Sequence, residues 1–201
     1  MAKRSMSSTV KIENLFENGI SENLIQQYLN QIENQTEQQS AISFFNWINQ
    51  ECKRSNIRFC NIFKIEGNCV AFLLTSCRSK NGYSEDMKLD VNGYLQSRRH
   101  AIAFNFYHAE LTYYADEAML EINDNYINNE NLHNKGIGSA GLTCIKSLAK
   151  QLKCKMIRGK AQMPNINDET GLKRLLYFYR KNDFLETDTE NHIVAYDCAK
   201  N

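Results

Sequence analysis

The chain has 201 residues, a formal net charge of +1, 42% hydrophobic residues and 23% charged residues. This length predicts one domain with a sizeable core, and the composition argues against collagen-like, coiled-coil and wholly disordered proteins. The balanced charge argues against a dedicated nucleic-acid binder, and no window approaches the ~18 apolar residues that a membrane span requires.

The seven cysteines form an odd set without C-x-x-C spacing, so neither a zinc site nor a redox motif is indicated. Several lie in apolar runs, where free Cys behaves as a small hydrophobic residue, and we predict reduced structural thiols. The first residues lack a signal-peptide pattern. These features predict a cytoplasmic protein without a metal, in which residues 1–9 are disordered and residues 10–201 form a single domain.

The first half of the chain predicts a strand, two helices and a hairpin. Residues 10–16 predict a short opening strand. Hydrophobic residues three and four apart predict two helices between residues 21 and 55, with Ser21 as an N-cap and a break at the polar stretch 34–39. Two β-rich runs at residues 58–66 and 69–78 are separated by a Gly-Asn pair, which predicts a hairpin.

The second half predicts further strands interleaved with two helices. Residues 79–99 are polar and predict a loop or insertion, within a longer segment at about 78–118. Residues 101–108 and 119–127 predict strands, and a glycine-containing loop then opens a helix of good periodicity. The remaining elements are predicted, in order, as a strand at 155–161, a helix at 172–179, and strands at 184–186 and 192–198.

The glycines are concentrated at one strand-to-helix junction. Gly136, Gly138 and Gly141, three of the nine glycines, lie within six residues of each other. A helix N-terminus leaves N–H groups unpaired and favours an anion, so this junction predicts a pyrophosphate-binding loop; a tight turn with one close helix contact is the alternative. The pattern is not a Walker A loop, and its late position after several strands fails the context of a Rossmann fingerprint.

Two further features follow this loop. Residues 153–181 hold eight basic residues against two acidic ones, which fits either a solvated face or a phosphorylated ligand. The segment FYRKNDF, residues 178–184, places Tyr179 at the C-terminal end of a helix. Tyr179 is either a core residue or a proton donor.

These features in this order resemble the GNAT superfamily of acyl-CoA-dependent N-acyltransferases. Lys135, Gly136 and Gly138 match the family's loop pattern, in which His133 replaces the usual Arg or Gln. Tyr179, Lys181 and Phe184 match its closing pattern, in which Asp183 replaces a glycine, and Leu175 and Leu172 stand where a small residue and Asn are usual. The resemblance covers residues 119–198 specifically. It implies an α/β (α+β) fold with a mixed, mostly antiparallel sheet that is splayed in the middle and flanked by helices.

The resemblance also implies a role for each matching residue, with acetyl-CoA as co-substrate. Backbone groups at the end of the strand before the loop would bind pantetheine and polarise the thioester carbonyl, namely those of Ile127 and Asn128. Backbone N–H groups of the loop would bind the pyrophosphate, namely those of His133, Asn134, Lys135, Gly136, Ile137, Gly138 and Ser139. Tyr179 would protonate the departing thiolate.

An attacking amine must lose its proton, because a free alkylamine has a pKa near ~10.4. The candidates for the base are Glu121, Asp124, His108 and Glu110, and their spacing does not separate them. Of these, we take Glu121 as the predicted base. No cysteine nucleophile is needed for direct transfer in a ternary complex, and Cys144 is predicted to be core.

The leading functional hypothesis is an N-acetyltransferase that transfers an acetyl group from acetyl-CoA to a primary amine. A GNAT-like protein that has lost catalysis and binds a partner is one alternative, motivated by His133, Asp183 and Leu172. An acetyltransferase acting on aminoacyl-tRNA is another, although the net charge of +1 argues against nucleic acid. The amine acceptor is unidentified, no membrane association is expected, and a homodimer is left open.

Overall fold

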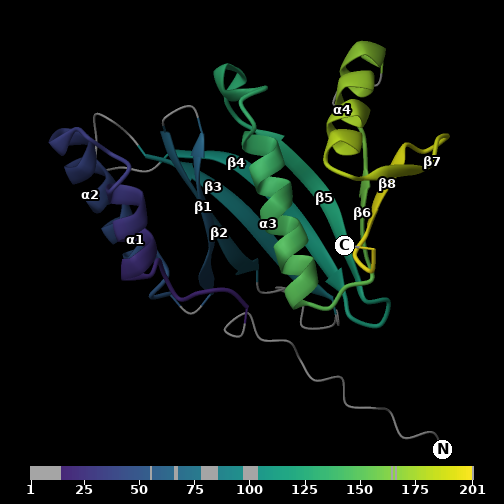
Figure 1. Ribbon diagram of the computed structural model, residues 1–201. Coiled ribbons are helices and arrows are strands. Elements are labelled where there is room, and N and C mark those ends of the chain that lie inside the picture. The colour runs from purple at the N-terminus through teal and green to yellow at the C-terminus, as the bar shows by residue number, and fades with distance from the viewer. Residues whose placement is uncertain are drawn as a thin grey trace, which may run out of the picture.

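The computed structural model describes residues 15–54, 56–65, 68–77, 86–96, 104–163, 165 and 167–200. Within them, one eight-stranded sheet carries four α-helices: α1 (Glu22–Leu29), α2 (Gln35–Glu51), α3 (Ile137–Gln151) and α4 (Glu169–Lys181) (Figure 1). The predicted disorder of residues 1–9 lies outside the described residues, and the single domain stays a prediction.

The strand order is β1-β2-β3-β4-β5-β6-β8-β7. Every neighbouring pair is antiparallel except β5 and β6, which are parallel. The predicted mixed, mostly antiparallel sheet is therefore confirmed. The strands are β1 (Ile57–Ile65), β2 (Asn68–Cys77), β3 (Met87–Leu95), β4 (Phe104–Tyr114), β5 (Met119–Ile127), β6 (Met156–Lys160), β7 (Leu185–Asp188) and β8 (Ile193–Asp197).

The helices cover opposite faces of this sheet, because side chains alternate along each strand. On β2, Val70, Phe72 and Leu74 belong to the core that packs under α3. The intervening Cys69, Ala71 and Leu73 belong to a second core under α1 and α2. In Figure 1, α3 lies across the centre of the sheet and α4 stands beside β6.

The two N-terminal helices begin at polar caps. Ser21 Oγ accepts the Leu24 N–H, as predicted, and Asn34 Oδ1 accepts the N–H groups of Thr36 and Glu37. The predicted break at 34–39 is wrong beyond Asn34, since α2 begins at Gln35. The Gln and Glu residues that suggested a linker are good helix formers once Asn34 caps them.

The predicted loop at residues 79–99 is wrong for its second half, which forms β3. Leu89 and Val91 are fully buried and alternate with half-buried Lys88, Asp90 and Asn92. This alternation is the pattern of a strand with one core face. The polar residues at the alternate positions made the segment resemble a loop in the sequence. Residues 78–85 lie outside the described residues.

The other boundaries differ from expectation at the ends of elements. Of the predicted opening strand, residues 10–14 are outside the described residues, and Glu17 makes a single bridge with Phe59. The strand expected at 101–108 continues to Tyr114. The predicted hairpin of β1 and β2 is confirmed by their antiparallel register, and β5 has the predicted bounds.

The described cysteines whose side chains are placed are all free thiols. Burial raises the pKa of Cys144 to about 12, which fits its predicted core position and leaves it protonated at neutral pH. Among the helices of the described part of the chain, none is long and apolar enough to cross a membrane.

Candidate active site

The sheet splits between β5 and β6. The two parallel strands pair from Met119 with Met156 to Ile122 with Gly159, and no pairing continues beyond this point. The last five residues of β5 therefore have β4 as a neighbour on one side only, within the described residues. This is the splayed middle that the family resemblance implies.

A β-bulge turns the backbone of β5 toward the split. Leu111 pairs with Ile122 and Glu110 pairs with Asp124, so Asn123 is the extra residue. The Asn128 N–H donates to Phe106 O at 2.8 Å. Because hydrogen-bonded and non-hydrogen-bonded pairs alternate in an antiparallel ladder, the N–H and C=O of Ile127 face away from β4.

These contacts separate the two predicted pantetheine-binding residues. Ile127 presents its backbone groups to the split, and its contact with pantetheine stays a prediction. The Asn128 N–H is already bonded within the sheet, so it is not free for pantetheine, and a contact through the other backbone group of Asn128 stays a prediction. The sequence could not distinguish the two residues, since the distinction depends on the register with β4.

The predicted phosphate loop leads into the N-terminus of α3. Gly136 is the N-cap with φ 83°, and no side chain caps the N–H groups that follow it. A Cβ added at Gly136 would meet nothing within 4 Å. The N–H groups of Ile137, Gly138 and Ser139 occupy the first turn, where no carbonyl of the helix can accept them.

The preceding residues are arranged differently from the prediction. The His133 N–H donates to Glu130 O at 3.0 Å, so this N–H is engaged within the loop and its predicted phosphate contact is wrong. The His133 ring lies at the split instead, with Nε2 3.3 Å from Ile127 O. Asn134 has φ 60°, and together with Gly136 it turns the chain into α3; Lys135 lies between them and is half-buried.

Close packing sets the depth of α3 on the sheet. A Cβ at Gly141 would overlap the ring and hydroxyl of Tyr107 on β4. A Cβ at Gly138 would come 3.1 Å from the ring of Phe178 on α4. The three clustered glycines thus have different functions: Gly136 turns the chain, and the other two allow close approach.

Tyr179 lies near the C-terminal end of α4, and its side chain is buried. Its ring packs against Phe178 and Phe184 with centroids 5.5 Å apart. Its hydroxyl is hydrogen-bonded by the side chain of Asn125, a residue of β5 beyond the point where β6 ends. Burial raises the pKa of Tyr179, although the bond from Asn125 lowers it in part, so Tyr179 keeps its proton at neutral pH. The structure therefore brings the predicted acid to the split.

Among known proteins, the chain is similar to solved structures alone. No protein-family model and no curated protein matches the chain. Solved structures do match it, and they include acetyltransferases. The chain is 20% identical to the PaiA N-acetyltransferase from Thermoplasma acidophilum in complex with coenzyme A, with 55% of this chain and 60% of that protein covered at a TM-score of 0.41.

Two other matches are of the same kind. Nourseothricin acetyltransferase is 10% identical, with 71% of this chain and 85% of that protein covered at a TM-score of 0.41. An acetyltransferase from Bacillus cereus is 16% identical, with 64% of this chain and 74% of that protein covered at a TM-score of 0.37. Likeness at this level concerns the fold alone. The mixed sheet and its split are those that the resemblance implies.

In this sheet, Glu121 is not placed with Tyr179. Glu121 Oε2 accepts the Tyr114 hydroxyl at 2.9 Å, and Oε1 lies 3.8 Å from Arg158 Nε. It is paired with β6 before the split, four residues from Asn125, which is about 13 Å along a strand. Its role as the base stays a prediction, and its carboxylate has partners of its own on the closed part of the sheet.

A row of three carboxylates lies level with the open part of β5. Asp90, Glu110 and Asp124 are directly opposite one another on β3, β4 and β5, on the face away from α3. Glu110 and Asp124 are exposed. Glu110 and Asp124 are both candidate bases from the sequence, but their alignment across β4 and β5 depends on strand register. Next to it, His108 Nδ1 lies 3.0 Å from Asn92 Oδ1.

The first residues of the basic tract do not lie at the phosphate loop. Lys153 and Lys155 follow the C-terminal end of α3, whereas the loop lies at its N-terminal end, about 22 Å away along a 15-residue helix. Arg158 faces Glu121. For Lys153 and Lys155 the solvated-face interpretation is the better one, because proximity in sequence here crosses the length of a helix.

Asp183 stands where the family pattern has glycine, and its backbone explains that preference. Its φ is 65°, the left-handed conformation, in the turn between α4 and β7. Its Oδ2 lies 2.9 Å from Lys146 Nζ on α3, and the same ammonium is 4.3 Å from the Tyr196 ring centroid. The departure from the pattern is thus accommodated by a contact between the turn and α3.

Asp183→Gly is expected to change the free energy of unfolding by no more than about 1 kcal/mol. Glycine relieves a left-handed conformation that costs an L-residue about 1–2 kcal/mol. Against this, glycine raises the conformational entropy of the unfolded chain, and the substitution removes an exposed ion pair worth about 0–1 kcal/mol. Urea unfolding followed by circular dichroism measures the balance. A loss of several kcal/mol would show that the Lys146 contact is structurally essential.

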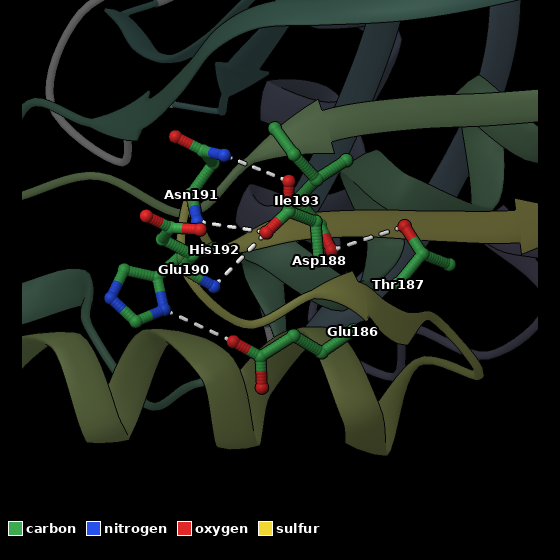
Figure 2. Close-up of polar contacts among 7 residues, drawn as sticks. All are labelled: Glu186, Thr187, Asp188, Glu190, Asn191, His192 and Ile193. Atoms are coloured by element: carbon green, nitrogen blue, oxygen red, sulfur yellow. Dashed lines mark hydrogen bonds and ion pairs between the residues drawn. The ribbon is translucent and has the colours of Figure 1, made fainter.

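The turn between β7 and β8 lies next to the C-terminal end of β6, since the Ala161 N–H donates to His192 O at 2.9 Å. Figure 2 shows its polar contacts. The Asp188 carboxylate accepts the N–H groups of Glu190 and Asn191 and the Asn191 amide, and the bonds from Asn191 lower the pKa of Asp188. His192 Nδ1 lies 3.0 Å from Glu186 Oε1. These bonds fix the turn beside the split.

No group of three or more His, Cys, Asp or Glu side chains in the described ranges is arranged to hold a metal ion.

Proposed function

We propose that the chain is an N-acetyltransferase that transfers the acetyl group of acetyl-CoA to a primary amine in a ternary complex. The observation that carries this proposal is the combination of an uncapped helix N-terminus that follows β5 and a buried tyrosine hydroxyl beside Asn125 of β5, where the sheet splits. Coenzyme A fits this arrangement, because the first turn of α3 offers three unsatisfied N–H groups to a pyrophosphate and Gly136 leaves open space before it.

Each group of the site has a role in this reaction. Bound acetyl-CoA supplies a thioester whose carbonyl carbon an amine attacks. The N–H groups of Ile137, Gly138 and Ser139 hold the phosphates, and the Ile127 N–H at the split edge donates to the thioester carbonyl oxygen, where negative charge develops. Tyr179 gives its proton to the departing sulfur.

The amine loses a proton on the face opposite α3. We assign this step to Glu110 or Asp124 in place of Glu121, because both are exposed and level with the open part of β5. A row of carboxylates also favours an acceptor that arrives as a cation. The carboxylates therefore support an amine as the acceptor, and experiment has to identify that amine.

Calorimetric titration with acetyl-CoA and with CoA tests the proposal, and Ser139→Asp sharpens it. An aspartate in the first turn of α3 is expected to stabilise the fold by about 0.3–1 kcal/mol through the helix dipole. It is expected to weaken CoA binding about tenfold or more, because it repels the phosphates. The two effects have opposite signs, so a general loss of structure cannot imitate them.

Ser147→Asp is the matched control, since Ser147 is an exposed residue near the other end of the same helix. It is expected to leave CoA binding unchanged. The proposed function is wrong if the wild-type protein binds neither acetyl-CoA nor CoA at millimolar concentration. The location of the phosphate site is wrong if Ser139→Asp binds CoA as tightly as the wild type.

A further inference from the structure

Thr112 holds a buried hydroxyl on β4, where three strands meet. The residue is 1% exposed. Its Oγ1 accepts a hydrogen bond from Lys88 Nζ on β3 and a second one from Asn123 Nδ2 on β5, each at 2.7 Å. A threonine hydroxyl has two acceptor positions, so these bonds use both. One buried oxygen therefore links β3, β4 and β5.

The link to β5 falls at the bulge of that strand. Asn123 is the extra residue, which has no partner of its own in the ladder with β4. Asn123 is exposed, yet its side-chain amide donates to the buried Thr112. A bond from an exposed amide replaces a bond to water, so its net contribution to stability is small. The bond instead ties the extra residue to a fixed point on β4.

The position of the bulge decides which backbone groups reach the split. Beyond the bulge, Ile127 pairs with Tyr107, and the Asn128 N–H donates to Phe106 O at 2.8 Å. This register leaves the N–H of Ile127 facing away from β4. If the bulge moved or was lost, the register would shift by one residue, and the groups beyond it would change direction. The Ile127 N–H would then turn from the split toward β4.

We propose that Thr112 is a positioning residue, which fixes the bulge through Asn123 and thereby keeps the Ile127 N–H directed at the split. The anchor is firm because Thr112 is buried and also bonded by Lys88. Thr112 acts only through β5 and touches none of the reacting atoms. The structural part of this inference concerns the free protein. Its effect on catalysis rests on the proposed function, in which the Ile127 N–H donates to the thioester carbonyl oxygen.

Amide hydrogen exchange of the free protein, measured by nuclear magnetic resonance, tests the structural part. Thr112→Val keeps the shape of the side chain and removes the acceptor. The Asn128 N–H is expected to exchange about 3- to 10-fold faster in this variant, which corresponds to the loss of one hydrogen bond, because its bond to Phe106 O depends on the bulge. The Cys198 N–H donates to Lys155 O at 3.0 Å and is the internal reference, whose exchange should not change.

Steady-state kinetics test the effect on catalysis, with acetyl-CoA and a panel of primary amines (diamines, triamines, amino sugars and a lysine peptide). Thr112→Val is expected to lower kcat about 10- to 100-fold, because the Ile127 N–H is displaced from the reacting carbonyl. The KM for acetyl-CoA should not change, since α3 holds the phosphates. The melting temperature should fall by a few degrees at most, because Asn123 is exposed and Lys88 is half-buried, so both donors reach water. A purely structural role would lower the melting temperature without separating kcat from KM.

Further variants separate the bond to Asn123 from the other contacts of Thr112. Asn123→Ala removes the same bond from the other side, and its combination with Thr112→Val should add no further loss. Thr112→Ser keeps the acceptor and should retain the exchange rate and kcat of the wild type. Thr75→Val is the matched control, because Thr75 is a strand threonine on β2, two strands away. It should change neither measurement.

The inference is overturned if Thr112→Val leaves the exchange of the Asn128 N–H unchanged. It is also overturned if Lys88→Met reproduces the faster exchange while Asn123→Ala does not, since Thr112 would then act through β3. Absence of CoA binding by the wild type would instead overturn the proposed function, and with it the expected effect on kcat. Faster exchange in the free Thr112→Val protein would still establish the anchored bulge.

Discussion

Tyr179→Phe is expected to lower kcat for acetyl transfer by about 100- to 1,000-fold while the protein stays folded. General acid catalysis contributes about 10²–10⁴-fold, and the thiolate then leaves without a proton donor. The ring contacts with Phe178 and Phe184 persist in the variant, since they do not involve the hydroxyl. The variant loses the bond from Asn125, so its free energy of unfolding should fall by about 1 kcal/mol.

The measurement is steady-state release of thiol from acetyl-CoA in the presence of the amine panel, with thermal unfolding in parallel. Tyr177→Phe is the matched control, because Tyr177 is on the same helix but 66% exposed. It should behave as the wild type. If Tyr179→Phe turns over at the wild-type rate, Tyr179 is a core residue only, and the acid has to be sought elsewhere at the split.

The second large effect is expected for Gly141→Ala, which should destabilise the protein by about 2 kcal/mol. Alanine gains about 1 kcal/mol over glycine within a helix, but its Cβ would overlap the Tyr107 ring, which is itself fixed against Phe72 and Gly93. Overpacking of a tight core costs typically 1–3 kcal/mol and occasionally more. Here the neighbour is a buried ring that cannot swing away, so the upper part of that range applies and outweighs the gain.

The same substitution is expected to weaken CoA binding, because α3 can relieve the overlap only by moving away from β4. Its N-terminal N–H groups then move relative to the split. Chemical denaturation and calorimetric titration measure the two effects. Gly159→Ala serves as the control, since the nearest atom to its new Cβ is at 3.4 Å, an ordinary contact. Equal stability of Gly141→Ala and the wild type would show that α3 does not need this close approach.

Much of the fold could be predicted from local pattern. Hydrophobic spacing predicted α3 and α4, and the bounds of β5 agree with the alternation of Leu120 and Ile122 with polar residues. β3 was missed because half of its residues are polar; its other face is buried only by contacts with distant parts of the chain. Local periodicity contains no information about such neighbours.

The sequence by itself determined that a glycine-rich turn opens α3 and that Tyr179 ends α4, because both depend on residues adjacent in the chain. Only the tertiary structure decided which groups face the split. The bulge at Asn123 and the register with β4 turn Ile127 toward the split and engage Asn128 within the sheet. They also align Glu110 with Asp124 and leave Glu121 bound to Tyr114. A shift of one residue reverses the face of every side chain in a strand, and register is fixed by packing across the whole sheet rather than by any local motif.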